Sequence, residues 1–358
     1  MNQWNIKNTF LPEDTKEALL KHNDIIDNYA LKLNKTVNFF KNKDLESAFD
    51  SNGEYKDTDL EKVLYKSEFK DKQKNLKNCN TNFNFQNCNK ENSDIMKKIY
   101  TRHLNNANSL LGESNVVKFE LSPDWRIALG LGNESVYETS ITLHHIYGIP
   151  YIPASAIKGI TRNWIITNCF DNKEKDAIQN KIFCDMFGCP ESVPYKDENG
   201  KKQSQPSYYA IQEPNIGGTR EGKIIFFDAF PTSAPNIEPD IMNNHYSDYY
   251  DGKGSKPPAD YDNPNPIFFL TLKNKDTNTP CTFQFIIGSK QFQPKISVYS
   301  NDVFKVFDPI EQSSVKKSKK YNYAGELTTL ELTQLWMELA LKQHGIGAKT
   351  AVGYGYMK

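Results

Sequence analysis

The chain has 358 residues, of which 38% are hydrophobic and 12% aromatic, so it can bury a sizeable core as one large domain or two smaller ones. Lysine and arginine together number 44, as do aspartate and glutamate, and the formal net charge is zero. This balance excludes a uniformly basic nucleic-acid-binding protein, but not a local basic groove, because affinity for phosphates depends on where the cations cluster. No run of about 18 apolar residues marks a membrane span and no apolar signal segment lies near the N-terminus, so we expect a cytoplasmic protein without membrane contact.

Cysteine usage points away from disulfides and from metal. Six cysteines are too few for a disulfide scaffold in a chain of this length. No CxxC occurs, and the pair Cys184 and Cys189 has no second pair at zinc-finger spacing. We therefore expect free, reduced thiols, no metal site and no cofactor.

The first 115 residues form a compositional block of their own. Apolar residues recur at helical spacing in residues 13–33, and residues 93–111 have the same character, with Ser93 in the N-cap position. Residues 75–92 are rich in asparagine, which favours turns and loops. We expect residues 1–115 to be a mainly helical N-terminal extension with an Asn-rich loop.

A second domain is predicted for residues 116–358. Residues 117–121 alternate between apolar and charged side chains, as in a half-buried strand. A Gly/Pro turn follows at 148–153, and the helix after it begins with Ser155 as the expected N-cap. Residues 171–220 are predicted to be a large, mostly polar connection.

Three strands are predicted in the next part of the chain. Residues 223–230 have the composition of a buried strand, and residues 231–266, rich in Pro, Tyr and Asp, are predicted to be a long insertion. Residues 267–272 and 282–287 are two further strands, and their short separation predicts an antiparallel pair. Residues 298–320 are expected to be a connection that carries a basic run.

The clearest helix in the sequence spans residues 328–344. Thr328 and Glu331 have the spacing of a capping box, and Gly345 ends the helix. Residues 351–356 can return as the last strand. The order strand, helix, strand, strand, helix, strand predicts an α+β fold, a ferredoxin-like (RRM-type) βαββαβ sandwich that carries the two large insertions.

The segment from Gly345 to Gly355, GIGAKTAVGYG, is the strongest functional signal. Glycine can turn sharply and lie close to a ligand, and a lysine with free backbone N–H groups beside it suits an anionic phosphate backbone. The alternative is a helix stop followed by a glycine-tolerant turn. The segment is not a Walker A loop, because Gln343 and Ala348 stand where that motif needs glycines.

A second segment, PASAIKGITR, agrees with the first. Ser155 at the helix start would leave backbone N–H groups and the positive dipole end facing outward, and Lys158 and Arg162 extend that positive surface by one turn each. Gly159 costs a helix about 1 kcal/mol relative to alanine, which suggests that a ligand approaches closely there. The alternative is a solvated basic face, with the glycine packed on a strand.

Histidines and tyrosines offer further candidates. His144 or His145 could shuttle a proton in RNA cleavage, but adjacent residues on an extended segment point to opposite sides, so at most one of them faces a given site. We favour structural or RNA-contact roles over catalysis for both. Tyr246, Tyr249 and Tyr250 lie in the second insertion and could stack on bases, or this loop could contact another protein.

Taken in order, these segments resemble a known family. GIPYIPASAIKGITR resembles the first-helix motif of the RAMP superfamily of CRISPR proteins, and GIGAKTAVGYG resembles its C-terminal glycine-rich loop. The pieces ITLHHIYGIPYIP, KIIFFDAFPT, IMNNHYSDYY and PADYDNPNPIFFLTL narrow the resemblance to the sixth Cmr subunits of type III-B effector complexes, over residues 116–358. Ala154 stands where the family commonly has a glycine before the serine, a departure that can alter how RNA approaches the helix start.

The resemblance implies a non-catalytic backbone subunit that holds the 3′ region of the CRISPR guide RNA in an antiviral complex. Implied partners are the guide RNA, target RNA, adjacent RAMP backbone subunits and a small helical subunit. By match to the two motifs, the RNA-binding residues are Ser155, Lys158, Arg162, Gly345, Gly347, Lys349, Thr350, Gly353 and Gly355. The further candidates for RNA or neighbour contact are His144, His145, Tyr246, Tyr249 and Tyr250.

Two rival functions stay open. A metal-independent CRISPR endoribonuclease of the same superfamily would use His144 or His145 together with Lys158. A scaffold that binds only proteins would contact no RNA once its partners were removed.

Overall fold

The structure is a computed structural model that describes residues 12–21, 30, 90–133, 139–233, 235–244, 249–250, 257, 265–273, 281–290, 295–300, 304–306 and 324–358. The fold is α+β, and the strand pairings in these ranges are antiparallel. The chain divides into two compact units, the first with residues 1–96, 125–151 and 233–281, the second with residues 97–124, 152–232 and 282–358. None of the helices in the described ranges is long and apolar enough to cross a membrane.

A four-stranded sheet forms the centre of the second unit. Its order is β1 (Val116–Leu121), β11 (Phe283–Ser289) and β7 (Ile224–Phe226), and β8 (Phe230–Pro231) also pairs with β11. All residues of β11 are buried. The central strand is therefore covered on both of its faces.

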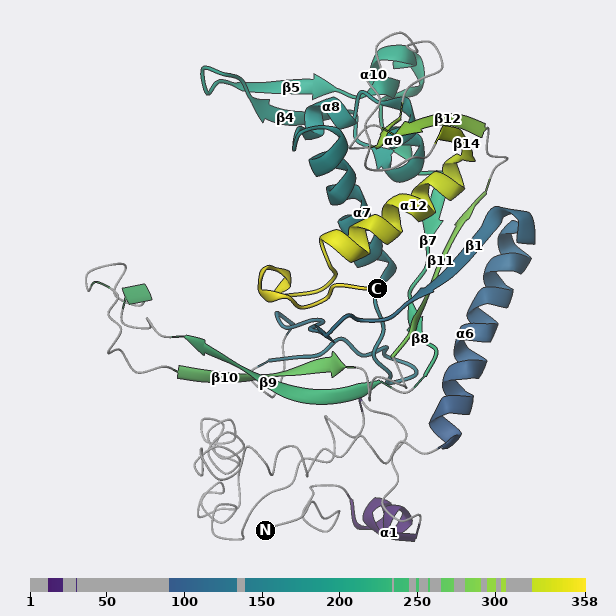
Figure 1. Ribbon diagram of the computed structural model, residues 1–358, viewed down its shortest axis with the longest axis vertical. Helices are drawn as coiled ribbons and strands as arrows, with labels where there is room; N and C mark the ends of the chain where they lie inside the picture. The colour runs from purple at the N-terminus through teal and green to yellow at the C-terminus, as the bar shows by residue number, and fades with distance from the viewer. Residues whose placement is uncertain are drawn as a thin grey trace. The chain divides into compact units, whose positions relative to one another are not determined.

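Two helices cover one face of this sheet (Figure 1). α7 (Ala154–Cys169) and α12 (Thr329–Gln343) pack against each other and against its strands. The indole N–H of Trp164 in α7 donates to Gln343 Oε1 at the end of α12, at 3.0 Å. The buried apolar side chains of this layer include Ile157, Ile165, Leu332, Trp336 and Met337.

A third helix, α6 (Lys90–Leu111), lies along the other face of the sheet (Figure 1). The ring of His103 meets the rings of Phe227 and Phe230 edge to face, with centroids 5.6 and 5.2 Å away. Gly288 permits this close approach, because a Cβ at that position would overlap a leucine side chain of α6. Part of the predicted N-terminal extension is therefore packed on the sheet.

The segment predicted to be a polar connection, residues 171–220, folds into short elements. Cys184, Cys189 and Tyr209 are buried together in a small core. The prediction of a mere connection is wrong, because elements this short carry too few residues for a visible hydrophobic period. They are α8 (Glu174–Ala177), α9 (Lys181–Phe187), β3 (Gly188–Cys189), β4 (Ser192–Lys196), β5 (Lys202–Pro206), α10 (Tyr208–Gln212), η4 (Pro214–Ile216) and β6 (Arg220–Glu221).

Three strands form the sheet of the first unit. β10 (Asn265–Lys273) pairs with β9 (Asn236–Asn244) along its full length and with β2 (Arg126–Ile127) at one end. The insertion predicted at 231–266 thus contains a strand. α1 (Glu13–Lys21) also belongs to this unit.

A further small sheet in the second unit precedes α12. β12 (Lys295–Ser300) pairs with both β13 (Phe304–Val306) and β14 (Ala324–Thr328). The connection predicted at 298–320 therefore holds β13 and the end of β12.

The start of α12 confirms the predicted capping box. The Glu331 N–H donates to Thr328 Oγ1 at 3.1 Å, and the Thr328 N–H donates to Glu331 Oε2 at 2.7 Å. The predicted start of the earlier helix is wrong, because α6 begins at Lys90 and Ser93 lies inside it.

Two strand predictions are also wrong. Residues 267–272 and 282–287 do not pair, because β10 and β11 lie in different sheets and β10 finds its partner inside the predicted insertion. The expected last strand is replaced by the 3₁₀ helix η6 (Thr350–Val352), after which Met357 makes an isolated bridge to Pro123.

Candidate nucleic-acid interface

The first turn of α7 is capped by Asp228, which lies 74 residues further along the chain. The N–H of Ala154 donates to Asp228 Oδ1 at 2.7 Å, and Pro153 takes the N-cap position without a side-chain bond. The expectation that Ser155 caps the helix is wrong, because Ser155 is its second residue and is exposed. A carboxylate therefore occupies part of the positive end of this helix, while the outer side of the first turn is open.

Gly159 bears on one of the two alternatives for the glycine of α7, that it packs on a strand. It is exposed, and a Cβ placed on it would meet no atom of the described residues within 4 Å. Gly159 therefore packs on no strand. Ser155 lies four residues earlier and so on the same side of the helix. The helix backbone is bare to an approaching ligand over this turn.

Lys158 stands beside this opening, with its side chain half-buried. Burial lowers the pKa of its ammonium group, the nearby Arg162 lowers this pKa further, and Glu221 raises it. An anion placed beside Lys158 would favour the charged form and oppose both lowering effects. An anionic ligand near this lysine would therefore stabilise its charged form.

Arg162 is tied to the segment that follows α7. Its guanidinium forms an ion pair with Glu174 and lies 5.2 Å from the centre of the Phe183 ring. The arginine side chain is 28% exposed. A phosphate would therefore have to share this guanidinium with a carboxylate.

The base of the glycine loop is a closed structural element. Gly345 and Gly355 are buried with φ of +72° and +79°, and the N–H of Ile346 donates to the carbonyl of Gly355 at 2.8 Å. A Cβ on Gly355 would overlap the carbonyl oxygen of Ile346. Two of the four glycines are thus explained by the closure of the loop itself.

The tip of the loop is exposed and holds the predicted lysine. Lys349 has left-handed backbone angles, φ 63° and ψ 29°, and is the N-cap residue of η6. Gly347 and Gly353 are exposed with φ of +97° each, and a Cβ on Gly353 would meet nothing within 4 Å among the described residues. Thr350 is half-buried at the turn, and its carbonyl accepts the N–H of Gly353 at 3.1 Å.

Both segments belong to the second unit. The bond between Trp164 and Gln343 joins the middle of α7 to the end of α12, two residues before Gly345. Each segment exposes part of its surface. Neither is sealed from solvent, so both are accessible to a nucleic acid.

His144 and His145 lie in a turn of the first unit. The expectation that they point to opposite sides is wrong, because the chain turns here and the two rings stack with centroids 4.8 Å apart. His144 Nδ1 accepts the N–H groups of Ile146 and Tyr147, both at 3.3 Å. One ring nitrogen of His144 therefore stabilises the turn.

Two of the three tyrosine candidates lie in the described residues. Tyr246 lies outside the described residues. Tyr249 and Tyr250 are 36% and 64% exposed, and their rings lie edge to face with centroids 5.4 Å apart. Aromatic surface is therefore available on this segment of the first unit.

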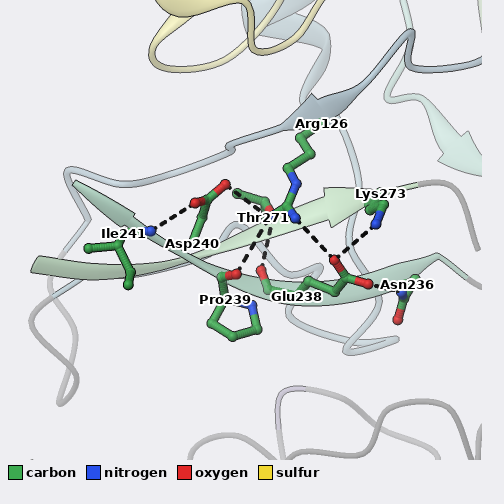
Figure 2. A network of polar contacts seen from close by, with 8 residues as sticks. All are labelled: Arg126, Asn236, Glu238, Pro239, Asp240, Ile241, Thr271 and Lys273. Atoms are coloured by element: carbon green, nitrogen blue, oxygen red, sulfur yellow. Dashed lines mark hydrogen bonds and ion pairs between the residues drawn. The ribbon is translucent and has the colours of Figure 1, made fainter. Parts of the chain in front are cut away.

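Sequence reasoning missed a polar network on the sheet of the first unit (Figure 2). The guanidinium of Arg126 donates to Asp240 at 2.9 Å and to Glu238 at 3.2 Å, and Lys273 also contacts Glu238, at 3.3 Å. Thr271 accepts a further bond from the arginine at 3.3 Å. These partners come from three strands, so no local sequence signal points to them.

No metal site is found in the described ranges, where no group of three or more His, Cys, Asp or Glu side chains is placed to hold an ion. Cys184 and Cys189 are buried free thiols. The Cys184 thiol donates to the carbonyl of Ile178 at 3.0 Å, and burial raises its pKa. A buried thiol of this kind behaves as a packing residue.

The structure defines the class of this protein. It is an antiparallel α+β protein that carries two segments with glycine and lysine. A sequence model of the RAMP superfamily matches residues 118–358, which is more than half of the chain. The chain belongs to the RAMP superfamily.

Two curated relatives carry the same designation. The chain is 32% identical over 289 residues to the CRISPR system Cmr subunit Cmr6 of Pyrococcus furiosus, a match that covers 73% of this chain and 72% of that protein. It is 25% identical over 181 residues to the Cmr6 subunit of Saccharolobus solfataricus, where the match covers 49% of this chain and 46% of the relative.

Two solved structures similar to the chain are a Cmr complex and a Cmr6 protein. A cryo-EM structure of the type III-B Cmr-β complex bound to cognate target RNA contains a chain with a TM-score of 0.42 and 20% identity; the match covers 73% of this chain and 65% of that one, just under two thirds. The crystal structure of Cmr6 from Pyrococcus furiosus has a TM-score of 0.31 and 29% identity, and the match covers 68% of this chain and 96% of that one.

Proposed function

We propose that this chain is a non-catalytic guide-RNA-binding subunit of a type III-B (Cmr) CRISPR effector complex. Its family and its similarity to Cmr6 subunits support assembly with neighbouring RAMP backbone subunits and a small helical subunit in the cytoplasm. The subunit would hold the 3′ region of the guide RNA, while base pairing between guide and target RNA supplies sequence specificity.

The observation that carries this proposal is the bare turn of α7. Gly159 weakens the helix, yet a Cβ at this position would meet no atom of the described residues within 4 Å, so packing gives no reason for a glycine there. Lys158 is the neighbouring residue in the helix and supplies a cation beside the open turn. A ribose-phosphate backbone fits this pairing, because it needs close approach and a cation and offers no sequence of its own to read.

A ferredoxin-like core in the second unit is also inferred. The elements β1, α7, β7, β11 and α12 follow one another in βαββα order, and β11 lies between β1 and β7, as expected for the third strand of that fold. The bridge between Met357 and Pro123 supports the C-terminal residues as a reduced fourth strand beside β1. In such a fold the start of α7 and the end of α12 face the same end of the sheet, where one RNA strand could use both.

Charge reversal tests RNA binding directly. In Lys158→Glu and Lys349→Glu variants we expect weaker guide RNA binding and a shallower dependence on salt, because each lost phosphate contact removes about 0.7 from the log–log slope for a single strand. Lys202→Glu, an exposed lysine on β5, is the matched control and should bind normally. Unchanged affinity and slope in both site variants would falsify the proposal.

The non-catalytic role has a separate test. The commitment of His144 Nδ1 to two backbone N–H groups argues for a structural role of this histidine. Purified protein incubated with a repeat-containing transcript in EDTA should leave the RNA intact. Site-specific cleavage that disappears in a His144→Ala/His145→Ala double variant would instead establish a ribonuclease.

A further inference from the structure

A second group of cations lies at one end of the central sheet. Ser289, the last residue of β11, pairs with Ile224, the first residue of β7. Lys290 and Lys223 therefore occupy neighbouring positions just beyond the two strands, with side chains 59% and 38% exposed. Two like charges placed across from each other are unfavourable unless counter-charges lie nearby.

Glu221 is the counter-charge that links this group to α7. Its Oε1 lies 3.6 Å from Lys290 Nζ, and the same carboxylate acts on Lys158 in α7. The Glu221 side chain is 85% exposed. An ion pair this open to water contributes little, so a stronger anion can replace the carboxylate without much loss.

Asp185 is the counter-charge on the other side. Its carboxylate lies 3.1 Å from Lys223 Nζ and 2.6 Å from Lys181 Nζ, and it also accepts from the hydroxyl of Tyr209. This aspartate is only 14% exposed and is fixed in place by its three partners. Three lysines thus share two carboxylates in this group.

We propose that Lys223 and Lys290 form a further phosphate-binding site for RNA at the ends of β7 and β11, and β7 packs against α7. Glu221 takes the place of a phosphate in the free protein and gives way when RNA binds. This inference rests on the proposed function and extends it to residues outside the two glycine segments.

The composition of the site favours RNA over a protein partner. Protein interfaces are built around aromatic and other apolar side chains, and lysine is depleted there. The charged groups of this site are lysines and carboxylates, and the side chains of Lys290 and Glu221 are 59% and 85% exposed. Lysine ammonium groups on flexible stems suit phosphates, which they meet as point charges.

The test measures binding of the full-length chain to a fluorescein-labelled single-stranded RNA of mixed sequence, by anisotropy across a salt series. The Lys223→Gln/Lys290→Gln double variant should bind about tenfold more weakly at low salt, with the log–log slope reduced by about 1.4. The matched control is Lys201→Gln/Lys202→Gln, which removes two lysines at the β4–β5 turn of the same unit and should leave affinity unchanged.

A third variant gives an effect of opposite sign. Glu221→Gln removes the competing carboxylate and should tighten RNA binding about threefold, which a folding defect could not mimic. Weaker binding by Glu221→Gln, or an equal loss in the control double variant, overturns the inference. If Lys158→Gln and Lys349→Gln weaken RNA binding but Lys223→Gln/Lys290→Gln does not, the further site is wrong and the proposed function stands. If none of these three variants changes RNA binding, the proposed function is wrong as well.

Discussion

The glycine of α7 and the glycines at the base of the C-terminal loop have opposite structural settings. Gly355 is buried with a left-handed backbone, and a side chain there would overlap the carbonyl of Ile346. Gly159 is exposed inside a regular helix, and a side chain there would meet nothing among the described residues. The fold requires the first glycine and gains nothing from the second.

This contrast separates a glycine that the fold requires from a glycine that, on the proposed function, leaves room for RNA. A glycine-rich motif read as a string gives all its members the same weight. Within the two motifs, a Cβ on Gly159 or on Gly353 would meet no atom of the described residues within 4 Å, so both positions leave room for a ligand. Substitutions at the two kinds of position should therefore affect different measurements.

The largest effect is expected at the base of the loop. Gly355→Ala should lower the free energy of unfolding by about 3 kcal/mol, because the left-handed backbone alone costs a side chain about 1–2 kcal/mol and the overlap with Ile346 adds strain. Urea denaturation followed by circular dichroism measures this. Gly353→Ala, with a similar φ and free space around it, is the control and should lose only about 1–2 kcal/mol. Equal losses would show that the overlap has no energetic weight.

The distant cap of α7 should rank next. Asp228→Ala leaves the N–H of Ala154 without its acceptor and should lower the free energy of unfolding by about 1–2 kcal/mol. Asp228→Asn keeps an acceptor oxygen and should retain most of the stability, again measured by denaturation. If the alanine and asparagine variants are equally stable, the carboxylate does not cap this helix.

At Gly159 the sign reverses. Gly159→Ala should raise the free energy of unfolding by about 1 kcal/mol and at the same time weaken guide RNA binding, because a methyl group would stand in the open turn. Denaturation and anisotropy on the same preparation measure the two effects. A variant that is more stable and binds RNA as tightly as the original chain would break the distinction between the two kinds of glycine.

The smallest effect concerns pH and the far side of the sheet. Burial lowers the pKa of His103, partly offset by Asp228, and burial lowers the pKa of His344 as well. The unfolded chain then binds more protons than the folded one, so stability is complete above about pH 6.5 and falls as the pH drops below it. Denaturation midpoints between pH 7.5 and 5 should decline less in a His103→Gln variant; a parallel decline would exclude this histidine as a source.

Local signals in the sequence were sufficient for some elements. The capping box of α12 joins two residues three positions apart, so it is visible in the sequence and is confirmed. The cap of α7 comes from Asp228, 74 residues downstream, and no local pattern could reveal it. Ser155 is of a residue type that favours the N-cap, so the sequence predicted it there, but Pro153 takes this position.

Most of the wrong predictions concern strand pairing, because strand partners can lie far apart in the sequence. The close spacing of β10 and β11 suggested a hairpin, yet β10 pairs with β9, which lies inside a segment whose Pro and Asp content suggested a loop. At the candidate site, the sequence predicted glycines and lysines, and only the structure distinguishes an exposed glycine from a buried one. The Arg126 network joins residues more than a hundred positions apart and left no trace in the sequence.

The packing of α6 against the sheet has a consequence for how a guide can be held. RRM domains read single strands by laying unstacked bases on an open sheet, and here α6 and the tight contact at Gly288 shut that platform. On the proposed function, a strand bound on the helical side by its sugar-phosphate backbone would keep its Watson–Crick faces turned away from the protein. Those faces would then be free to pair with a complementary strand.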